Sequence, residues 1–500
     1  MFNKLTTVCL LLLAATAHAH GNLKLVNGRW YNGNTFEPRT MYSVGNVLRT
    51  SFDGEAQVVD LANRYVIPPL ADAHNHVLAD GSRVDEELAR YLRAGIFYVK
   101  NPNNSPSRAA ATRARMNTPE TVDVLYANAG ITSTGGHPSQ IYAPLGAPFA
   151  DAWFAADSVE AVDAIWPKVV AGKPDFIKIY LEHSDDAEKR RGLLPEVARA
   201  VVHRAHKDGL RVAAHVTSAG DFRIAVEVGA DEIAHLPLGP IAPDDAAAAA
   251  KRGVTVVTTT LSHRPAPGIA DVPTLHRANL KVLRDAGVTV ILGVDDGGPT
   301  VVDEAGNVAR LGVYSAAEVL RMLVETTPRS MFPGRRIGRL EEGAEASLLA
   351  LDGNPLEDLR ALRKVAVRVK QGHVLTVPPE KTSVAEALLP LLMSNGVDAA
   401  VAEYRRLLAG EPERWDFSEP QLNRLGYALL QHGKSREAIA IFRLNAERFP
   451  KSSNVWDSLA EAFMRDGQRE LAIANYRKAL ELDPKNENAK KMLEKVMKDP

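Results

Sequence analysis

The chain has 500 residues, of which 45% are hydrophobic and 24% are charged. This length exceeds that of one ordinary domain, and the composition is typical of globular proteins. The formal net charge of −1 gives no electrostatic reason to propose nucleic acid or an acidic membrane surface as a partner.

Residues 1–19 have the pattern of a cleaved signal peptide. Lys4 supplies the positive charge, residues 8–15 form a short apolar core, and Ala17-His18-Ala19 is a small-x-small cleavage signal. This core is shorter than the about 20 apolar residues that cross a bilayer. Cleavage would also remove Cys9, the single cysteine of the chain. We therefore expect an exported protein, periplasmic or secreted, that has no thiol and no membrane span.

Residues 20–67 read as short strands and turns. Asn27-Gly28 and Asn32-Gly33 separate alternating segments, which is a strong signal for β-hairpins. The β pattern returns in residues 335–380, after a long central region. We expect the two segments to pair as one composite β-sandwich domain.

Residues 68–334 alternate between strand-like and helical patterns. The eight predicted strands cover residues 66–76, 96–100, 122–128, 175–180, 211–215, 232–235, 254–258 and 288–295. This α/β pattern predicts a TIM (β/α)8 barrel, a fold that takes about 250 residues. The alternative is an open doubly wound sheet, which would place a Gly-rich turn after its first strand. This chain has His74-Asn75-His76 there.

Residues 383–498 repeat with a period of 34 residues, which separates Gly433 from Gly467 and Pro450 from Pro484. That period predicts an all-α tetratricopeptide repeat domain. Residues 383–408 read as a degenerate earlier helix pair, and residues 490–497 as a capping helix. Pro378-Pro379 marks the linker before the repeats.

The predicted barrel strands carry side chains of metal-ligand types at their carboxyl ends, where TIM-barrel active sites are built. These residues are His74, His76, Lys178, His215, His235 and Asp295. Each has an ordinary alternative, such as a packed histidine, a turn aspartate or a misassigned strand for Lys178. However, residues placed by chance would not all lie at strand ends, so the joint pattern favours a shared site. A lysine pointing into the barrel is also costly unless something compensates its charge.

These residues resemble the metal-ligand set of the amidohydrolase superfamily, and the resemblance covers residues 21–377. Thr134-Gly135-Gly136-His137 and the spacing of 20 residues between His215 and His235 resemble its imidazolonepropionase-like and prolidase-like group. Three departures, Pro138, Asp296 and the segment 216–220 after His215, lie where such an enzyme reads its substrate. They leave every ligand in place and concern the choice of substrate.

The resemblance implies two divalent metal ions, for which zinc best suits imidazole and carboxylate ligands. His74, His76 and Asp295 would hold one ion and His215 and His235 the other, with carboxylated Lys178 bridging them. Asp295 would also act as the catalytic proton carrier. His137 and Tyr180 are candidate substrate-binding residues. Their alternative roles are a turn residue before Pro138 and simple packing.

The sequence thus predicts an exported, metal-dependent amidohydrolase that cleaves a C–N bond in a small peptide or a cyclic amide. One alternative is an esterase or lactonase that uses the same site. Another is a non-catalytic scaffold that acts through its repeats. In each of these readings, the repeats could bind a protein partner or self-associate.

Overall fold

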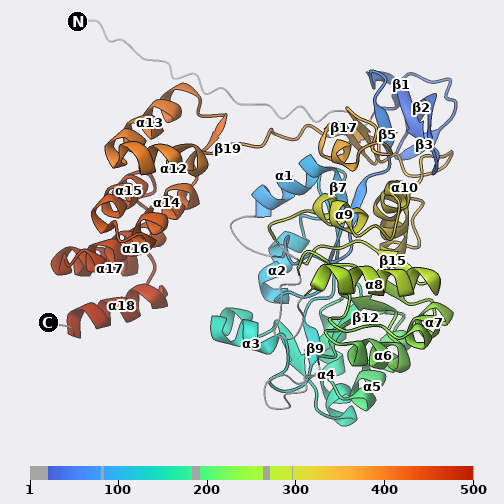
Figure 1. Cartoon of the computed structure of the whole chain (residues 1–500), viewed down its shortest axis with the longest axis horizontal. Helices are drawn as coiled ribbons and strands as arrows, with labels where there is room; N and C mark the ends of the chain where they lie inside the picture. Colours follow the sequence, from blue (N-terminus) through green and yellow to red (C-terminus); the bar gives the residue numbers. More distant parts are fainter. Residues whose placement is uncertain (1–20, 80–83, 183–191, 263–270, 296, 499–500) are drawn as a thin grey trace, which may run out of the picture. The chain divides into compact units, whose positions relative to one another are not determined.

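The computed structural model describes residues 21–79, 84–182, 192–262, 271–295 and 297–498 (Figure 1). The predicted signal peptide and Asp296 lie outside these ranges. The chain divides between Pro378 and Pro379 into two compact units, at the Pro-Pro pair that marks the predicted linker. Among the described residues, no helix has the length and apolar character needed to cross a bilayer.

The small β domain of the first unit is built from both predicted segments. Its strands are β1 (Leu23–Tyr31), β2 (Phe36–Val44), β3 (Val47–Arg49), β4 (Gln57–Asp60), β5 (Tyr65–Ile67), β16 (Leu348–Leu351), β17 (Val365–Lys370) and β18 (His373–Val374). The order is β18-β17-β16-β5-β1-β2-β3, with β4 also paired to β1. An antiparallel β-bridge pairs Val47 of β3 with Glu345, which lies just before β16. The expected sandwich is thus one hydrogen-bonded sheet that curls around a core including Trp30 and Leu348.

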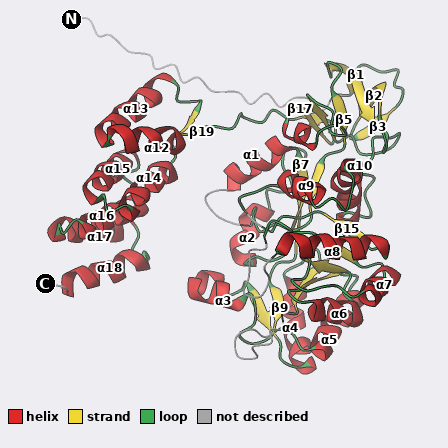
Figure 2. Ribbon diagram, in the orientation of Figure 1, coloured by secondary structure: helices red, strands yellow, loops and turns green. Residues whose placement is uncertain are grey.

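The rest of the first unit is the predicted TIM barrel, in which strands alternate with helices (Figure 2). The barrel strands are β6 (Leu70–Asp72), β7 (Ile96–Asn101), β8 (Asp123–Tyr126), β11 (Ile177–Tyr180), β12 (Val212–His215), β13 (Glu232–Ala234), β14 (Thr255–Val257) and β15 (Thr289–Ile291). They pair in parallel in two groups, β6–β8 and β11–β15. The Ala73 N–H donates to Leu292 O at 2.9 Å, and the Asp175 N–H donates to Tyr126 O at 2.8 Å. These bonds join the two groups and close the barrel.

Helices cover the outside of the barrel and leave its strand ends open. They include α1 (Val84–Ala94), α2 (Pro106–Arg113), α4 (Val159–Ala171), α5 (Pro195–Lys207), α6 (Ala219–Val228), α7 (Pro243–Lys251), α8 (Val272–Asp285), α9 (Val301–Arg310) and α10 (Ala316–Arg321). The buried residues of α5 are Val197, Ala198, Val201, Val202 and Ala205, an i, i+3, i+4 stripe typical of a helix that packs on a sheet.

Three further sequence predictions differ from the structure. The predicted first strand, residues 66–76, divides into β5 and β6, because Pro68 and Pro69 have no N–H to donate to a sheet ladder. β6 then ends at Asp72, so His74 and His76 lie just beyond the strand. Likewise β13 and β15 end before His235 and Asp295. β9 (Gly130–Thr132) and β10 (Trp153–Ala155) were not predicted, and they extend the second group of strands beside β11.

The second unit is a stack of helix pairs with its own hydrophobic core, as the repeat predicts. The helices are α12 (Val384–Asn395), α13 (Val397–Gly410), α14 (Glu419–Gln431), α15 (Ser435–Arg448), α16 (Ser453–Arg465), α17 (Arg469–Leu482) and α18 (Glu487–Lys498). Ala438 and Ala472, separated by one repeat, are both fully buried. Phe442 and Tyr476, the next pair in register, are also fully buried. The periodic positions of the sequence are therefore the core positions of the stack.

Truncation after Pro378 should leave a folded, metal-binding first unit, because all of the predicted ligands precede that residue. The fragment 379–500 should fold separately as a helical unit, because its buried residues form one continuous cluster. Circular dichroism should show a cooperative thermal transition for each fragment. An aggregated 21–378 fragment, with no cooperative transition, would contradict this independence.

Candidate active site

A cavity of about 400 Å³ opens at the carboxyl ends of the barrel strands. Its lining includes every candidate site residue of the sequence analysis: His74, His76, His137, Lys178, Tyr180, His215, His235 and Asp295. These residues come from positions far apart in the chain. The barrel brings them together because the carboxyl ends of parallel strands meet at one face.

His74, His76 and Asp295 meet on one side of this cavity. Asp295 Oδ1 lies 3.2 Å from His74 Nε2 and 3.1 Å from His76 Nε2. The backbone fixes this approach, because the Asp295 N–H donates to His74 O at 2.7 Å. His76 Nδ1 lies 3.1 Å from Asn103 O, and this backbone carbonyl can accept a hydrogen bond from an Nδ1–H. The other ring nitrogen of His76, Nε2, then faces the Asp295 carboxylate.

His215 and His235 lie next to this group. His235 Nε2 is 2.9 Å from His215 Nδ1, and the ring centroids of His74 and His235 are 4.6 Å apart. Burial lowers the pKa of His74 to about 3 and the pKa values of His215 and His235 well below the ordinary value. Neutral imidazole is the form that binds metal ions. The buried imidazoles are therefore in the state that a metal site requires.

Asp295 provides the negative charge of the cluster. Burial alone would raise its pKa, but the adjacent His74 and His235 hold it well below the ordinary range. The carboxylate is therefore ionised, the form that ligates a metal ion. His74, His235 and Asp295 each have a potential ligand atom within 4.8 Å of the others.

Lys178 is the least compensated side chain of the cavity. It is 1% exposed, and within the described ranges its Nζ has no hydrogen-bond partner. Burial lowers its pKa to about 7, although Asp295 and Glu232 favour its charged form. The barrel holds a second buried lysine, Lys100, whose Nζ donates to both carboxylate oxygens of Glu232 at 2.7 and 2.8 Å. Among the described residues, the fold thus provides a hydrogen-bond partner for Lys100 but not for Lys178, whose Nζ lies 5.5 Å from the centre of the Tyr180 ring.

His137 and Tyr180 form the wall on the His215 side of the cavity. The His137 ring stacks on His215 with centroids 4.8 Å apart and meets Tyr180 at 5.0 Å. Both side chains line the cavity.

Glu182 is a site residue that the sequence analysis missed. It follows Lys178 and Tyr180 at a spacing of two, is 6% exposed, and places Oε2 3.5 Å from His137 Nδ1. His137, Glu182 and His215 form a second group of potential metal ligands, with ligand atoms within 4.8 Å of one another. The available signal was the period-two spacing of Lys178 and Tyr180 on β11, continued to Glu182 two residues past the end of that strand.

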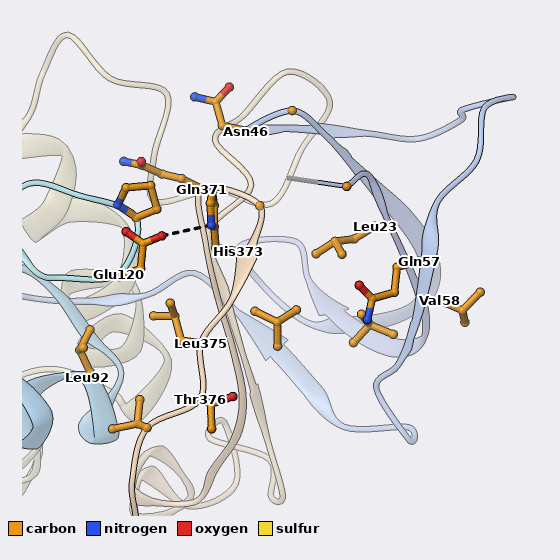
Figure 3. A pocket seen from close by; sticks show the side chains of 17 residues that line it. Leu23, Asn46, Gln57, Val58, Leu92, Glu120, Gln371, His373, Leu375 and Thr376 are labelled. Atoms are coloured by element: carbon orange, nitrogen blue, oxygen red, sulfur yellow. Dashed lines mark ion pairs between the residues drawn. The ribbon is translucent and has the colours of Figure 1, made fainter. Parts of the chain in front are cut away.

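A larger cavity, of about 1020 Å³, lies between the small β domain and barrel residues that include Leu92 and Glu120 (Figure 3). Its lining includes Val58 of β4, Leu375 just after β18, and an ion pair in which His373 Nδ1 and Glu120 Oε1 are 3.4 Å apart. None of the candidate residues lines it. The volume of a cavity therefore does not identify the candidate active site, whereas the cluster of histidine side chains does.

Residues 65–377 match the model of the amidohydrolase family, and residues 453–486 match the tetratricopeptide repeat. Ochratoxinase of Aspergillus niger is 28% identical over 214 residues, which are 39% of this chain and 44% of that protein. The chain therefore matches less than half the length of this curated relative.

Solved structures share the fold of the first unit. The crystal structure of A. niger ochratoxinase superposes with a TM-score of 0.60 at 18% identity, over 72% of this chain and 97% of that one. A putative prolidase from Bifidobacterium longum gives a TM-score of 0.60 at 20% identity, over 75% of this chain and 99% of that one.

Proposed function

The chain belongs to the amidohydrolase family, and from this premise we propose that it is an exported, metal-dependent hydrolase of C–N bonds. The observation that carries the proposal is Lys178, a buried amine that lies among neutral imidazoles and an ionised carboxylate and has no hydrogen-bond partner in the part of the chain that the structure describes. Carboxylation of Lys178 would convert this uncompensated amine into an anionic ligand. The residues present therefore fit a metal centre.

Two divalent ions suit this donor set, and zinc is the proposed metal because imidazole and carboxylate ligands favour it. His74, His76 and Asp295 would hold one ion, and His215 and His235 the other. Carboxylated Lys178 would be shared between them. The observed 3.1 and 3.2 Å between Asp295 and the two imidazoles suit ligands about 2.0–2.2 Å from a common ion.

Bound ions would lower the pKa of a water molecule and polarise the substrate carbonyl. Asp295 would accept the proton as that water attacks the carbonyl carbon. It would then deliver the proton to the leaving nitrogen, as a general base and then a general acid. His137 and Tyr180, on the opposite wall, would orient the substrate, with Glu182 behind His137.

The proposed substrate is a small peptide or a cyclic amide. Support comes from the size of the cavity, about 400 Å³, and from the prolidase and ochratoxinase among the similar proteins. Ile141 and Tyr142 add apolar surface to the same cavity. A side chain of the substrate would pack against them.

We further propose that the protein is exported through its N-terminal segment, because residues 1–19 have the pattern of a signal peptide. The repeats of the second unit would bind a protein partner or a second copy of the chain. The family match within residues 453–486 supports this role.

Elemental analysis of the purified protein should find close to two divalent ions per chain, and turnover should be measured on a dipeptide panel. Removal of metal with a chelator should abolish turnover, and added zinc should restore it. His74→Ala and His215→Ala should each lose metal and activity together, because each removes a proposed ligand. An active preparation that contains no metal would refute the site assignment.

A further inference from the structure

Thr259 follows β14 in an unusual backbone conformation. Its φ is +40°, in the left-handed region, as are His235 at +78° and Asp295 at +60°. Asp and His enter this region more readily than most side chains, whereas a β-branched residue there is an outlier. Such outliers persist only where the surrounding structure enforces them, and they cluster at functional sites. We therefore expect contacts around Thr259 that hold it in this conformation.

The hydroxyl of Thr259 points at a proposed metal ligand. Thr259 Oγ1 lies 2.8 Å from His235 Nδ1, and the Thr259 N–H donates to Gly293 O at 3.1 Å. The other nitrogen of that ring, Nε2, faces His215. A ligating histidine nearly always donates its second N–H to a neighbouring group, which fixes the tautomer and the ring orientation.

A buried carboxylate on α9 holds the two residues that follow Thr259. Glu304 Oε1 accepts the Thr260 N–H at 2.7 Å and its hydroxyl at 2.9 Å, and Oε2 accepts the Leu261 N–H at 3.1 Å. Glu304 is fully buried. Asn307, one turn further along α9, donates to Thr260 Oγ1 at 2.7 Å. The turn is therefore held to α9 by four hydrogen bonds immediately beside Thr259.

We propose that Thr259 is a positioning residue for His235 and that Glu304 keeps it in place. The Thr259 hydroxyl oxygen accepts a hydrogen bond from the Nδ1–H of His235, which directs Nε2 toward the proposed metal centre. Glu304 fixes the turn that carries this hydroxyl. The inference rests on the proposed function, because it assumes that His235 is a ligand.

The test compares Thr259→Val with Thr259→Ser. Val keeps the β-branched shape without the hydroxyl, whereas Ser keeps the hydroxyl. Zinc affinity of the purified full chain is measured by competition with a chromogenic chelator, and thermal unfolding of each metal-free variant is recorded in parallel. Loss of a group that orients a metal ligand typically weakens metal affinity or activity by about 10- to 100-fold. Thr259→Val should therefore bind zinc about 10- to 100-fold more weakly, and Thr259→Ser close to wild type.

Thr259→Gly separates hydrogen bonding from folding. Gly adopts a positive φ without a steric penalty, so this variant relieves the strain while it removes the hydroxyl. It should lose zinc affinity as Thr259→Val does. Wild-type affinity in both variants would overturn the inference, whereas a wild-type chain that binds no zinc would refute the proposed function itself.

Glu304→Gln tests the supporting role of α9. Its effect on zinc affinity should not add to that of Thr259→Val, because both act through the same contact to His235. Fully additive losses would show that Glu304 acts independently of Thr259.

Discussion

Replacement of Asp295 by Asn is expected to lower turnover at least about 10²-fold, the low end for general acid–base catalysis, while most of the metal stays bound. Asn keeps the shape and one ligand oxygen but does not carry a proton. His74 and His76, which face the same oxygen, remain in place. Asn also tolerates the left-handed region, so the backbone at φ +60° is not disturbed.

The measurement is metal content and turnover of Asp295→Asn beside Asp296→Asn. Asp296→Asn is the matched control, because it removes a carboxylate from the next residue of the sequence. It should retain most of the activity. An inactive Asp296→Asn beside an active Asp295→Asn would move the proton carrier by one residue and contradict the assignment.

The barrel was predictable because its signal is local. Each strand is a short apolar run, each helix has a 3.6-residue period, and a β-α order with strand-end histidines leaves few alternatives. The repeat domain was predictable for a similar reason, since Phe442 and Tyr476 occupy one core position in successive units. Neither inference required knowledge of which residues touch across the fold.

The ends of the barrel strands were less predictable. Apolar character continues past β15 through Leu292 and Val294, although the strand ends at Ile291. Composition does not reveal where the ladder stops. The turn at Asp295 results from backbone bonds to His74, which is more than 200 residues earlier. A prediction based on periodicity therefore extends the last barrel strand to Asp295, through the turn that orients the Asp295 carboxylate.

The groups that support the ligands could not be predicted, because their contacts exist only in the folded chain. Glu304 is 44 residues from Thr260, and in the sequence it is one acidic residue in the first turn of a helix. Thr259 is one of three consecutive threonines, Thr258 to Thr260, and nothing in the sequence distinguishes it. Glu182 differs, because its spacing from Lys178 was visible and only its burial was not.

Lys178→Ala is expected to lose nearly all turnover and part of the metal, because it removes the proposed shared ligand. A neutral amine is needed for reaction with carbon dioxide, and a pKa of about 7 leaves a substantial neutral fraction near neutral pH. The Ala variant opens a space where the side chain was. Acetate or formate can enter this space and place a carboxylate near the former carbamate position. These acids should therefore restore part of the turnover, with a saturable dependence on their concentration.

Lys100→Ala is the control, because it truncates the other buried lysine of the barrel. It leaves Glu232 buried and unpaired, which is costly, so Tm should fall. Short acids should not rescue it, since Lys100 already has a carboxylate partner. Equal rescue of both variants would show a general effect of the acids. Full metal content and turnover in Lys178→Ala would remove the shared ligand from the mechanism, and a site with one metal ion would then replace the site with two.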